Sequence, residues 1–208
     1  MDNRQKLIDG ASRMGIELSD QQQDALLHYM AMLLKWNRVY NLVSRKETNN
    51  IVEVHLLDSL SVLPYIRGFR VIDVGSGAGL PGIPLAILRP DCEFTLLDSS
   101  GKKGRFRTQA VIELGLNNVT VVNERAEQFD AGQGFDVVIS RAFATVAGML
   151  GVAGHMIGVD GRFLAMKGVN PRKELDGIPS QYRVEEIYPL EVPYLGAERH
   201  LAILAKIG

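Results

Sequence analysis

A glycine-rich turn follows the first short apolar run of the sequence, and an acid stands just before it. The stretch reads RVIDVGSGAGLPGIP from position 70, with Gly75, Gly77 and Gly79 separated by small residues. Because glycine has no Cβ, such a turn can be tight and its backbone can come close to a ligand. Ligands of open α/β sheets bind beyond the carboxyl ends of the strands. The turn therefore predicts a binding site lined by these three glycines.

Asp73 indicates which kind of ligand the turn binds. The dinucleotide pattern G-x-G-x-x-G would need a third glycine at position 80, where the chain has Leu80. The Asp73 carboxylate would repel a pyrophosphate but could accept a hydrogen bond from an ammonium group. Alternatively it only anchors the loop, since a buried carboxylate must be hydrogen-bonded. The pattern favours a cofactor with a positive group and no phosphate, and S-adenosylmethionine fits that description.

Two further positions at strand ends are typical of nucleoside binding. Asp98 ends the second expected strand and lies 98 − 75 = 23 residues after Gly75, close to the spacing of roughly 20 for an acid that binds a ribose. Both NAD and S-adenosylmethionine carry a ribose, so this acid does not distinguish them, and a helix N-cap is its alternative role. Ala126 and Glu127 follow the third expected strand, where an adenine edge could be read.

Arg141 is the predicted catalytic residue because it directly follows the fourth expected strand, FDVVIS. Its guanidinium could pair with the methionine carboxylate or orient a phosphate or a guanine, and a surface salt bridge is the alternative. The following segment lacks the Asn/Asp-Pro-Pro-aromatic motif of enzymes that methylate exocyclic amines. Methylation of cytosine C5 needs a cysteine nucleophile, and the single cysteine, Cys92, precedes the second strand, at the wrong edge of the sheet. These absences favour a ring nitrogen, or a similarly ready nucleophile, as the methyl acceptor.

A basic cluster, GKKGRFR, begins the helix expected after Asp98. Cations at a helix N-terminus cost a few tenths of a kcal/mol to roughly 1 kcal/mol each, and bound phosphates would offset that cost. A solvated basic turn is the alternative. Three more residues at strand ends extend the expected basic rim. The predicted RNA-binding residues are Lys102, Lys103, Arg105, Arg107, Lys167, Arg199 and His200.

The elements that must position these residues change character after Gly68. Before it the chain is helical: Ser19 and Gln22 form a capping-box pattern ahead of one amphipathic helix, and a second helix is expected over 50–63. After it, β-rich runs alternate with helical connections, which is typical of a parallel sheet. Strands are expected at 70–74, 93–98, 119–123, 135–140 and 161–167, and two more within 183–192 and 199–207 form an antiparallel hairpin. We therefore expect an α/β fold in which residues 1–68 form a helical extension packed on a cofactor-binding domain of residues 69–208.

Composition excludes several other classes. The chain has 208 residues, a net charge of −1 and one cysteine, which argues against a disulfide framework and suits a reducing cytosol. The start, MDNRQKLIDG, lacks the apolar run of a signal peptide.

The four histidines are not paired at metal-ligand spacing, so no metal is expected. His55 and Asp58 share a helix face and either form a structural hydrogen bond or line the RNA side. We expect a cytoplasmic monomer without a membrane partner.

Several motifs together are more specific than any one of them. The segments KWNRVYNLVS, HLLDSL, DVGSGAGLPGIPLAI, FTLLDSSGKK, VVISRAF and ERHLAIL occur in that order between about residues 20 and 206. The glycine segment resembles the first motif of class I methyltransferases. The ordered set resembles the bacterial small-subunit ribosomal RNA guanine-N7 methyltransferases, the RsmG or GidB type.

The resemblance implies a Rossmann-like class I methyltransferase sheet with helices on both faces. It also implies an S-adenosylmethionine-dependent enzyme that forms 7-methylguanosine in 16S rRNA of the small ribosomal subunit. The chain differs mildly from the residues commonest in the family motifs at Ser76, Ala78, Leu80 and Lys103. The cofactor contacts implied by the family are Gly75, Leu80, Ala126, Glu127 and Arg141, with Asp98 and Ser99 near the ribose.

Three other functions remain open from the residues alone. A small-molecule methyltransferase would use the same loop under a hydrophobic lid, and the basic cluster argues modestly against it. An NAD(P)-dependent oxidoreductase is disfavoured by Asp73, by Leu80 and by the lack of a Tyr-x-x-x-Lys pair. A non-enzymatic RNA-binding protein would leave the glycine turn and Asp98 unexplained, although fold alone does not fix function.

Overall fold

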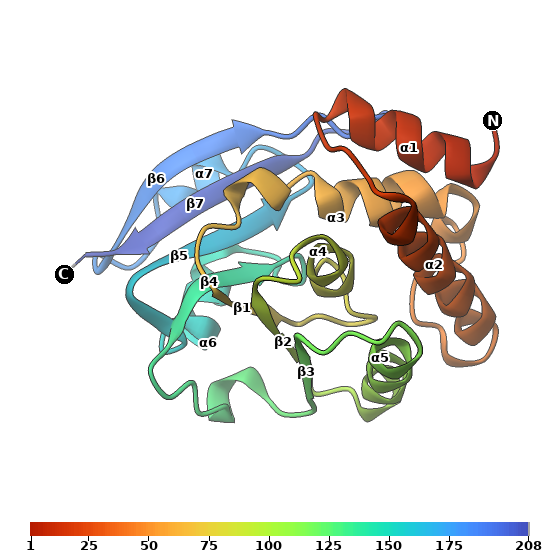
Figure 1. Ribbon diagram of the computed structural model, residues 1–208. Helices are drawn as coiled ribbons and strands as arrows, with labels where there is room; N and C mark the ends of the chain where they lie inside the picture. The colour runs from red at the N-terminus through yellow and green to blue at the C-terminus, as the bar shows by residue number, and fades with distance from the viewer. Residues whose placement is uncertain (208) are drawn as a thin grey trace.

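The sheet is built from short β-branched runs that lie where the hydrophobic pattern places them. The computed structural model describes residues 1–207, and the sheet order is β3-β2-β1-β4-β5-β7-β6 (Figure 1). β1 to β5 pair with one another in parallel, whereas β7 is antiparallel to both β5 and β6. The strands are β1 (Arg70–Val74), β2 (Glu93–Leu97), β3 (Val119–Val122), β4 (Phe135–Ser140), β5 (Ile157–Lys167), β6 (Tyr182–Pro189) and β7 (His200–Lys206). The expected parallel sheet with a terminal hairpin is confirmed.

Helices precede the sheet and connect its strands. The α-helices are α1 (Asn3–Arg13), α2 (Asp20–Tyr40), α3 (Asp58–Leu60), α4 (Gly82–Leu88), α5 (Gly101–Glu113), α6 (Val146–Ala153) and α7 (Arg172–Leu175). The 3-10 helices are η1 (Glu47–Asn50), η3 (Leu63–Tyr65) and η4 (Ala126–Gln128), and a π-helical segment, η2, spans Val52–Leu57. No helix among residues 1–207 is long and apolar enough to cross a membrane.

The helix expected over 50–63 is the main departure from the predicted elements. The wide turns of η2 and the short α3 replace it, with η1 ending at Asn50 and η3 beginning at Leu63. The Ser59 and Ser61 hydroxyls donate to the carbonyls of His55 and Asp58, which is the local competition that disturbs helices. π-helical turns are rare and often occur at functional sites. Here His55 of η2 and Asp58 of α3 line the same surface hollow.

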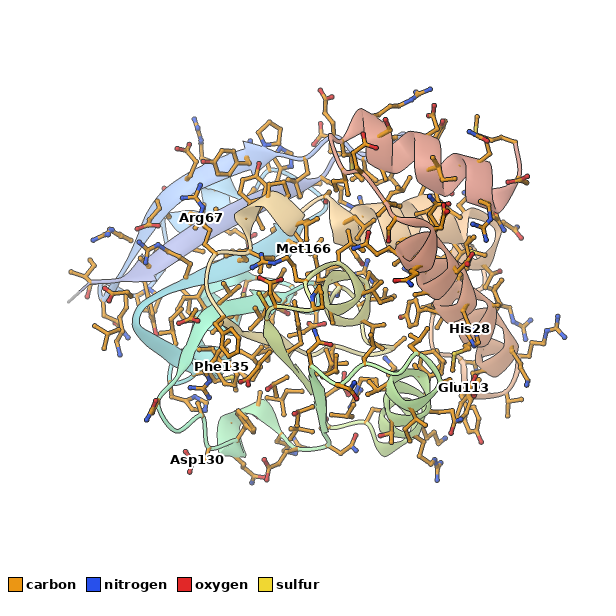
Figure 2. The ribbon with its side chains drawn as sticks, in the orientation of Figure 1. His28, Arg67, Glu113, Asp130, Phe135 and Met166 are labelled. Carbon is orange, nitrogen blue, oxygen red and sulfur yellow. The ribbon has the colours of Figure 1, made fainter. Side chains whose placement is uncertain are left out.

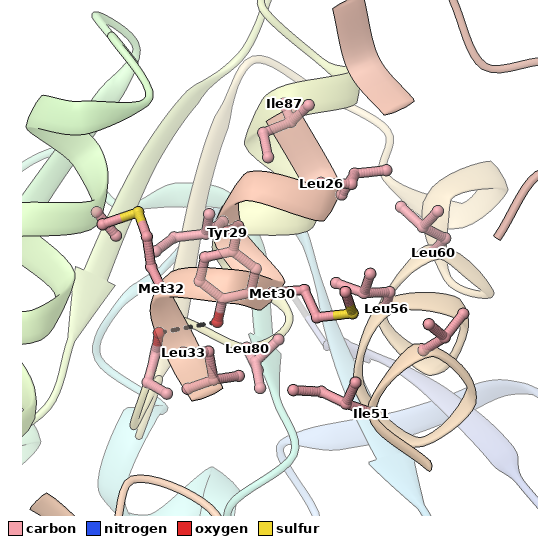
Figure 3. Close-up of a cluster of buried hydrophobic side chains, with 14 of the residues drawn as sticks. Leu26, Tyr29, Met30, Met32, Leu33, Ile51, Leu56, Leu60, Leu80 and Ile87 are labelled. Atoms are coloured by element: carbon pink, nitrogen blue, oxygen red, sulfur yellow. Dashed lines mark hydrogen bonds between the residues drawn. The ribbon is translucent and has the colours of Figure 1, made fainter. Parts of the chain in front are cut away.

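α2 begins and packs as its sequence predicts. Ser19 accepts from the Gln22 N–H and the Gln22 side chain accepts from the Ser19 N–H, so the capping box is formed. Its buried face contributes to a cluster with side chains of η2, α3, α4 and the glycine turn (Figure 3). His28 of α2 also faces Glu113 of α5, with Nε2 and Oε2 3.3 Å apart (Figure 2). α2 is therefore in contact with the elements that carry the binding site.

Alternation along β1 assigns its side chains to two different cores. Val71 packs in the cluster that contains Leu85 and Ala86 of α4, whereas Ile72 and Val74 pack in the cluster built on α6. Helices therefore cover both faces of the sheet (Figure 1). The largest cluster joins residues of α1 and α2 to residues of α4 and α5. The N-terminal helices thus extend the hydrophobic core on the α4 face.

Candidate active site

The turn after β1 has a backbone that only glycine adopts readily. Gly75, Gly77 and Gly79 have φ values of 73°, 56° and 94°, in the left-handed region that disfavours other residues. A Cβ on Gly75 would lie 2.6 Å from the Ala142 Cβ, and one on Gly79 would lie 2.4 Å from Ile83 Cδ1. The glycines therefore let β1 end tightly against α4 and against the segment that follows β4.

Polar groups from outside the turn hold it in place. The N–H groups of Gly75 and Ser76 donate to the Leu97 carbonyl at 2.8 and 3.1 Å. The Gly77 N–H donates to Asp98 Oδ2 at 2.9 Å. On the other side of the turn, the Tyr29 hydroxyl of α2 donates to the Ala78 carbonyl at 3.0 Å (Figure 3). β2 and α2 thus fix the turn from two directions.

Arg107 is also part of this support, which corrects its assignment to RNA binding. Its side chain is fully buried. Nη1 donates to the Gly77 carbonyl at 2.7 Å, and Nη2 donates to Asn123 Oδ1 at 2.9 Å and to the Asp98 carbonyl at 3.3 Å. A buried guanidinium needs such partners, and one so enclosed cannot reach a phosphate. Its sequence neighbours Lys102 and Arg105 are exposed on α5.

Asp73 supports the turn from beneath, so the prediction that it contacts the cofactor is wrong for this structure. Its carboxylate is fully buried, and Oδ2 accepts from the Gly82 N–H at 2.9 Å. Oδ1 is buried without a partner among residues 1–207. Burial raises the pKa of Asp73 from 3.8 to about 7, opposed by the Gly82 hydrogen bond. The anchoring alternative for this acid is the one that the geometry favours. Gly79 is likewise buried and shapes the turn from within.

A first hollow lies beyond the carboxyl ends of β1 to β3. It is lined by five of the predicted cofactor residues, together with Glu124, Phe143 and others. Those five are Gly75, Asp98, Ser99, Ala126 and Glu127. Asp98 Oδ1 also accepts from the Ser100 N–H at 2.7 Å at the start of α5, so this acid supports the helix as well as facing the hollow.

A second hollow adjoins the first at Gly75 and extends over the glycine turn. Gly75, Gly77 and Leu80 line it, together with Ser44, Lys103 and Arg141. Lys103, predicted to bind RNA, has its Nζ 3.7 Å from where a Cβ of Gly77 would stand. It therefore belongs to the mouth of this hollow rather than to the exposed surface of α5.

A third hollow adjoins the second, and Glu47, His55 and Arg141 line both. Asp58, Met166, Lys167 and Arg199 are among its other lining residues. The three hollows follow one another along the carboxyl edge of the parallel strands. This edge is the predicted location of the site.

Asp58 holds two arginines in the third hollow. Its carboxylate is buried, with Oδ2 accepting from Arg141 Nη1 at 2.8 Å and Oδ1 accepting from Arg199 Nε at 2.7 Å. Arg141 also reaches the Val54 carbonyl at 3.3 Å. The alternative role expected for Arg141 is a surface salt bridge. Arg141 does form an ion pair, but its partner is a buried acid inside the hollow. This pairing orients both guanidinium groups toward the third hollow.

His55 is buried beside Arg141 at the third hollow. Its side chain is 3% exposed, and neither ring nitrogen has a hydrogen-bond partner among the described residues. Burial, with the nearby Arg141 charge, lowers the pKa of His55 from 6.5 to about 4. The structural hydrogen bond to Asp58 is not formed, and the imidazole is neutral at pH 7.

Two residues of the predicted basic rim lie in this hollow and one does not. Lys167 Nζ bonds the Ala144 carbonyl at 2.6 Å and Glu174 Oε1 at 3.0 Å, and Arg199 pairs with Asp58. His200 is buried where β7 pairs with Lys167 of β5, so its assignment to the RNA-binding rim is wrong. Cross-strand pairing directs its side chain into the interior.

Sequence reasoning missed Glu47, which lies on the wall between the second and third hollows. The Ser44 N–H donates to its Oε2 at 2.9 Å, and the Glu47 N–H donates to the Ser44 carbonyl at 3.1 Å. The spacing Ser44-x-x-Glu47 is the capping-box signature and would have indicated an ordered carboxylate here. Among residues 1–207, no group of three or more His, Cys, Asp or Glu side chains could hold a metal ion.

The strand order, the glycine turn after β1 and the hollows at the strand ends are those of the class I methyltransferase fold. A SAM-dependent methyltransferase from Aquifex aeolicus superposes with a TM-score of 0.57 at 16% identity, covering 81% of this chain and 97% of its own. TrmN from Thermus thermophilus gives 0.54 at 16% identity, covering 71% of this chain and 47% of its own. At such identities the likeness concerns the fold, and the predicted Rossmann-like α/β class is confirmed.

Sequence similarity is much closer to one family within that class. The family profile described as rRNA small subunit methyltransferase G matches residues 22–202. A protein of Aromatoleum aromaticum named ribosomal RNA small subunit methyltransferase G is 50% identical over 205 residues, 96% of this chain and 97% of its own. The protein of that name from Cronobacter sakazakii is 50% identical over 199 residues, 96% of this chain and 95% of its own. The chain belongs to the rRNA small subunit methyltransferase G family, as the ordered motifs indicated.

Replacing Arg107 tests whether it supports the glycine turn. Arg107→Met leaves several buried oxygens without their donor, so we expect the free energy of unfolding to fall by about 2 kcal/mol or more. S-adenosylmethionine should bind about tenfold more weakly. Urea unfolding and calorimetric titration measure the two effects. The matched variant Arg105→Met, on the exposed side of the same helix, should change stability by no more than about 0.5 kcal/mol. Equal effects of the two variants would contradict the assignment.

The buried acid gives stability a defined pH dependence. With a pKa of about 7 when folded and 3.8 when unfolded, the Asp73 contribution is fully present below about pH 3.8 and is lost as pH rises toward 7. His55 acts oppositely: its contribution is present above pH 6.5 and is lost as pH falls toward 4.

Because Asp73→Asn keeps His55, subtracting the variant's free energy of unfolding from that of the wild type isolates the acid. We expect this difference to fall as pH rises through the window between the two Asp73 pKa values, with a slope of at most about 1.4 kcal/mol per pH unit. Chemical denaturation at several pH values measures it. A difference that does not vary with pH would show that folding does not raise the pKa of Asp73.

Proposed function

We propose that this protein transfers a methyl group from S-adenosylmethionine to N7 of a specific guanine in 16S rRNA of the small ribosomal subunit. The observation that carries the proposal is the series of three adjoining hollows at the strand ends of a chain from this family. The first two provide room for a nucleoside and its amino-acid tail, and the third opens beside them for an acceptor base. Arg141 lies on the wall between donor and acceptor spaces.

The residues of the first two hollows fit this cofactor. Three acids, Asp98, Glu124 and Glu127, line the first hollow against one cation, Arg125. The excess of carboxylates disfavours a phosphate, whereas a ribose diol can donate to carboxylates. Gly75 and Gly77 open their backbone to the second hollow, where Lys103 and Arg141 supply charge for a carboxylate. When bound, S-adenosylmethionine supplies a methyl group attached to a sulfonium. The lone pair of the acceptor forms a bond to the methyl carbon as the C–S bond breaks. The proposed contacts are Gly75, Gly77, Leu80, Asp98, Ser99, Ala126, Glu127 and Arg141.

The acceptor side needs positioning more than acid–base chemistry. Guanine N7 already carries a lone pair, so no proton has to leave before attack. No general base is therefore demanded, and orientation can supply most of the acceleration. Asp58 holds Arg141 in place. The other N–H donors of the planar guanidinium remain able to bond to ligand groups. We assign it the catalytic role of orienting donor and acceptor.

The RNA would approach over α5 and the third hollow. Lys102 and Arg105 are exposed near the start of α5, and Lys103 lies at the mouth of the second hollow. Lys167 and Arg199 line the third hollow from β5 and β7. Since contacts between cations and phosphates supply most sequence-independent affinity, this edge of the sheet is the proposed RNA-binding surface.

Methyl incorporation tests the function directly. Labelled S-adenosylmethionine is incubated with the enzyme and with 16S rRNA or small subunits that lack the modification, and the product nucleoside is identified and mapped. We expect label in 7-methylguanosine at one position. Label in another nucleoside would refute the assigned atom, and no label in RNA despite cofactor binding would favour a small-molecule acceptor. Arg141→Ala should lower kcat/KM about 100-fold, whereas Arg183→Ala, on β6 away from the hollows, should leave it unchanged.

Salt dependence of binding tests the proposed surface. In a Lys102→Gln/Arg105→Gln variant, fewer phosphates are neutralised, so RNA should bind more weakly. The slope of log K against log salt should fall by roughly 0.7 to 1 for each phosphate that is no longer paired with a cation. Filter binding at several salt concentrations measures the slope. Lys206→Gln/Arg183→Gln removes equal charge far from the hollows and should leave the slope unchanged. If both double variants behave alike, the α5 cations do not contact RNA.

A further inference from the structure

Glu47 is an ordered carboxylate at the point where donor and acceptor spaces meet, and methyl transfer alone assigns it no role. With His55 and Arg141 it forms the wall between the second and third hollows. The Ser44 N–H donates to Oε2 at 2.9 Å. The hydrogen bonds of the described residues leave Oε1 free, and the side chain is 39% exposed. The carboxylate is thus held in place with capacity to accept further bonds.

The neighbouring basic side chains, Arg141 and His55, do not satisfy this carboxylate. Arg141 directs Nη1 to Asp58 and to the Val54 carbonyl. His55 Nε2 lies 3.8 Å from Glu47 Oε2, beyond hydrogen-bond distance, and its ring is neutral at pH 7. Partial burial by itself would raise the pKa of Glu47, but hydrogen bonds from Ser44, with the Arg141 charge, lower it overall. Glu47 is therefore an anion that only accepts hydrogen bonds.

Guanine offers the donors that such an acceptor needs. Its N1–H and 2-amino group point the same way and match the two oxygens of a carboxylate. N7, O6 and N1–H follow one another around the ring, so a base that turns N7 toward the second hollow presents O6 and N1–H to the wall of Glu47 and Arg141. Adenine instead carries an unprotonated N1, whose lone pair would face the carboxylate. Enzymes that modify bases commonly read the Watson–Crick edge in this way.

We propose that Glu47 selects the target guanine by accepting hydrogen bonds from its N1–H and 2-amino group while N7 faces the second hollow. The inference rests on the proposed function and adds to it the residue that reads the base. A polar site built for particular donors rejects an analogue that lacks them, because its own groups are then left unpaired. Arg141 supplies the complementary donors for O6.

Inosine tests the contact because it keeps N7, O6 and N1–H but lacks the 2-amino group. Small subunits are reconstituted from ligated 16S rRNA with guanosine or inosine at the mapped position, and kcat/KM for methyl transfer is measured on both. For the wild type we expect inosine to be about tenfold or more poorer, the usual effect of losing a hydrogen bond to a charged group. Glu47→Gln should lower kcat/KM on guanosine about tenfold or more and bring the guanosine-to-inosine ratio near one.

Two further variants separate reading of the base from a structural role. Glu47→Asp retains a carboxylate and should keep part of the preference for guanosine. Glu93→Gln, exposed at the opposite end of β2, should leave both substrates unchanged. A merely structural loss would lower transfer to guanosine and inosine equally, so the ratio is the decisive readout.

Three results would overturn the inference. One is a Glu47→Gln enzyme that retains the wild-type ratio. Another is a loss of S-adenosylmethionine affinity in that variant as large as its loss of kcat/KM, which would make Glu47 a cofactor ligand. The third is a wild-type enzyme that forms no 7-methylguanosine on either RNA, which would remove the proposed function and this inference together. The first two leave the proposed function intact.

Discussion

The binding site depends on satisfying the backbone polar groups of one glycine-rich turn. Residues 75–82 cannot pair as a strand or as the interior of a helix, and buried N–H and C=O groups left without partners are costly. Within the turn, the Gly79 and Leu80 N–H groups donate to the Ser76 carbonyl. The other partners come from elsewhere in the chain: Leu97 and Asp98 at the end of β2, Arg107 on α5, Asp73 beneath the turn and Tyr29 on α2. Positive φ angles at the glycines are therefore maintained by tertiary contacts.

This dependence explains why the N-terminal helices belong to the functional unit. Tyr29 contacts Ala78 through its hydroxyl and packs against Phe106 of α5, with ring centroids 6.1 Å apart. Trp36 of α2 packs on the same ring at 5.6 Å. α2 thus fixes both the turn and the helix that carries Arg107. Further along, η1 and η2 supply Glu47 and His55, so the first 60 residues also line the second and third hollows.

What the sequence predicts well is what depends on local pattern. β1 and β4 lie where their apolar runs place them, and the Ser19–Gln22 box forms because its partners are three residues apart. The direction of a side chain depends on tertiary packing. Arg107 and Arg105 lie in one basic run, yet their helical positions place one in the interior and the other in solvent. His200 points inward by its register on β7. Glu47 acquires its place only when η1 comes near residues distant in sequence, such as Arg141.

The bond between Asp58 and Arg199 joins positions 141 residues apart. The contacts that hold the glycine turn join positions closer in sequence: Gly77 and Asp98, for example, are 21 residues apart. Arg199 immediately precedes β7, and the pairing of β7 with β5 and β6 sets its place. Opening of the β7 pairing would remove Arg199 from the third hollow while the glycine turn kept its own hydrogen bonds. The third hollow thus depends on long-range strand pairing, which is intrinsically slow to form.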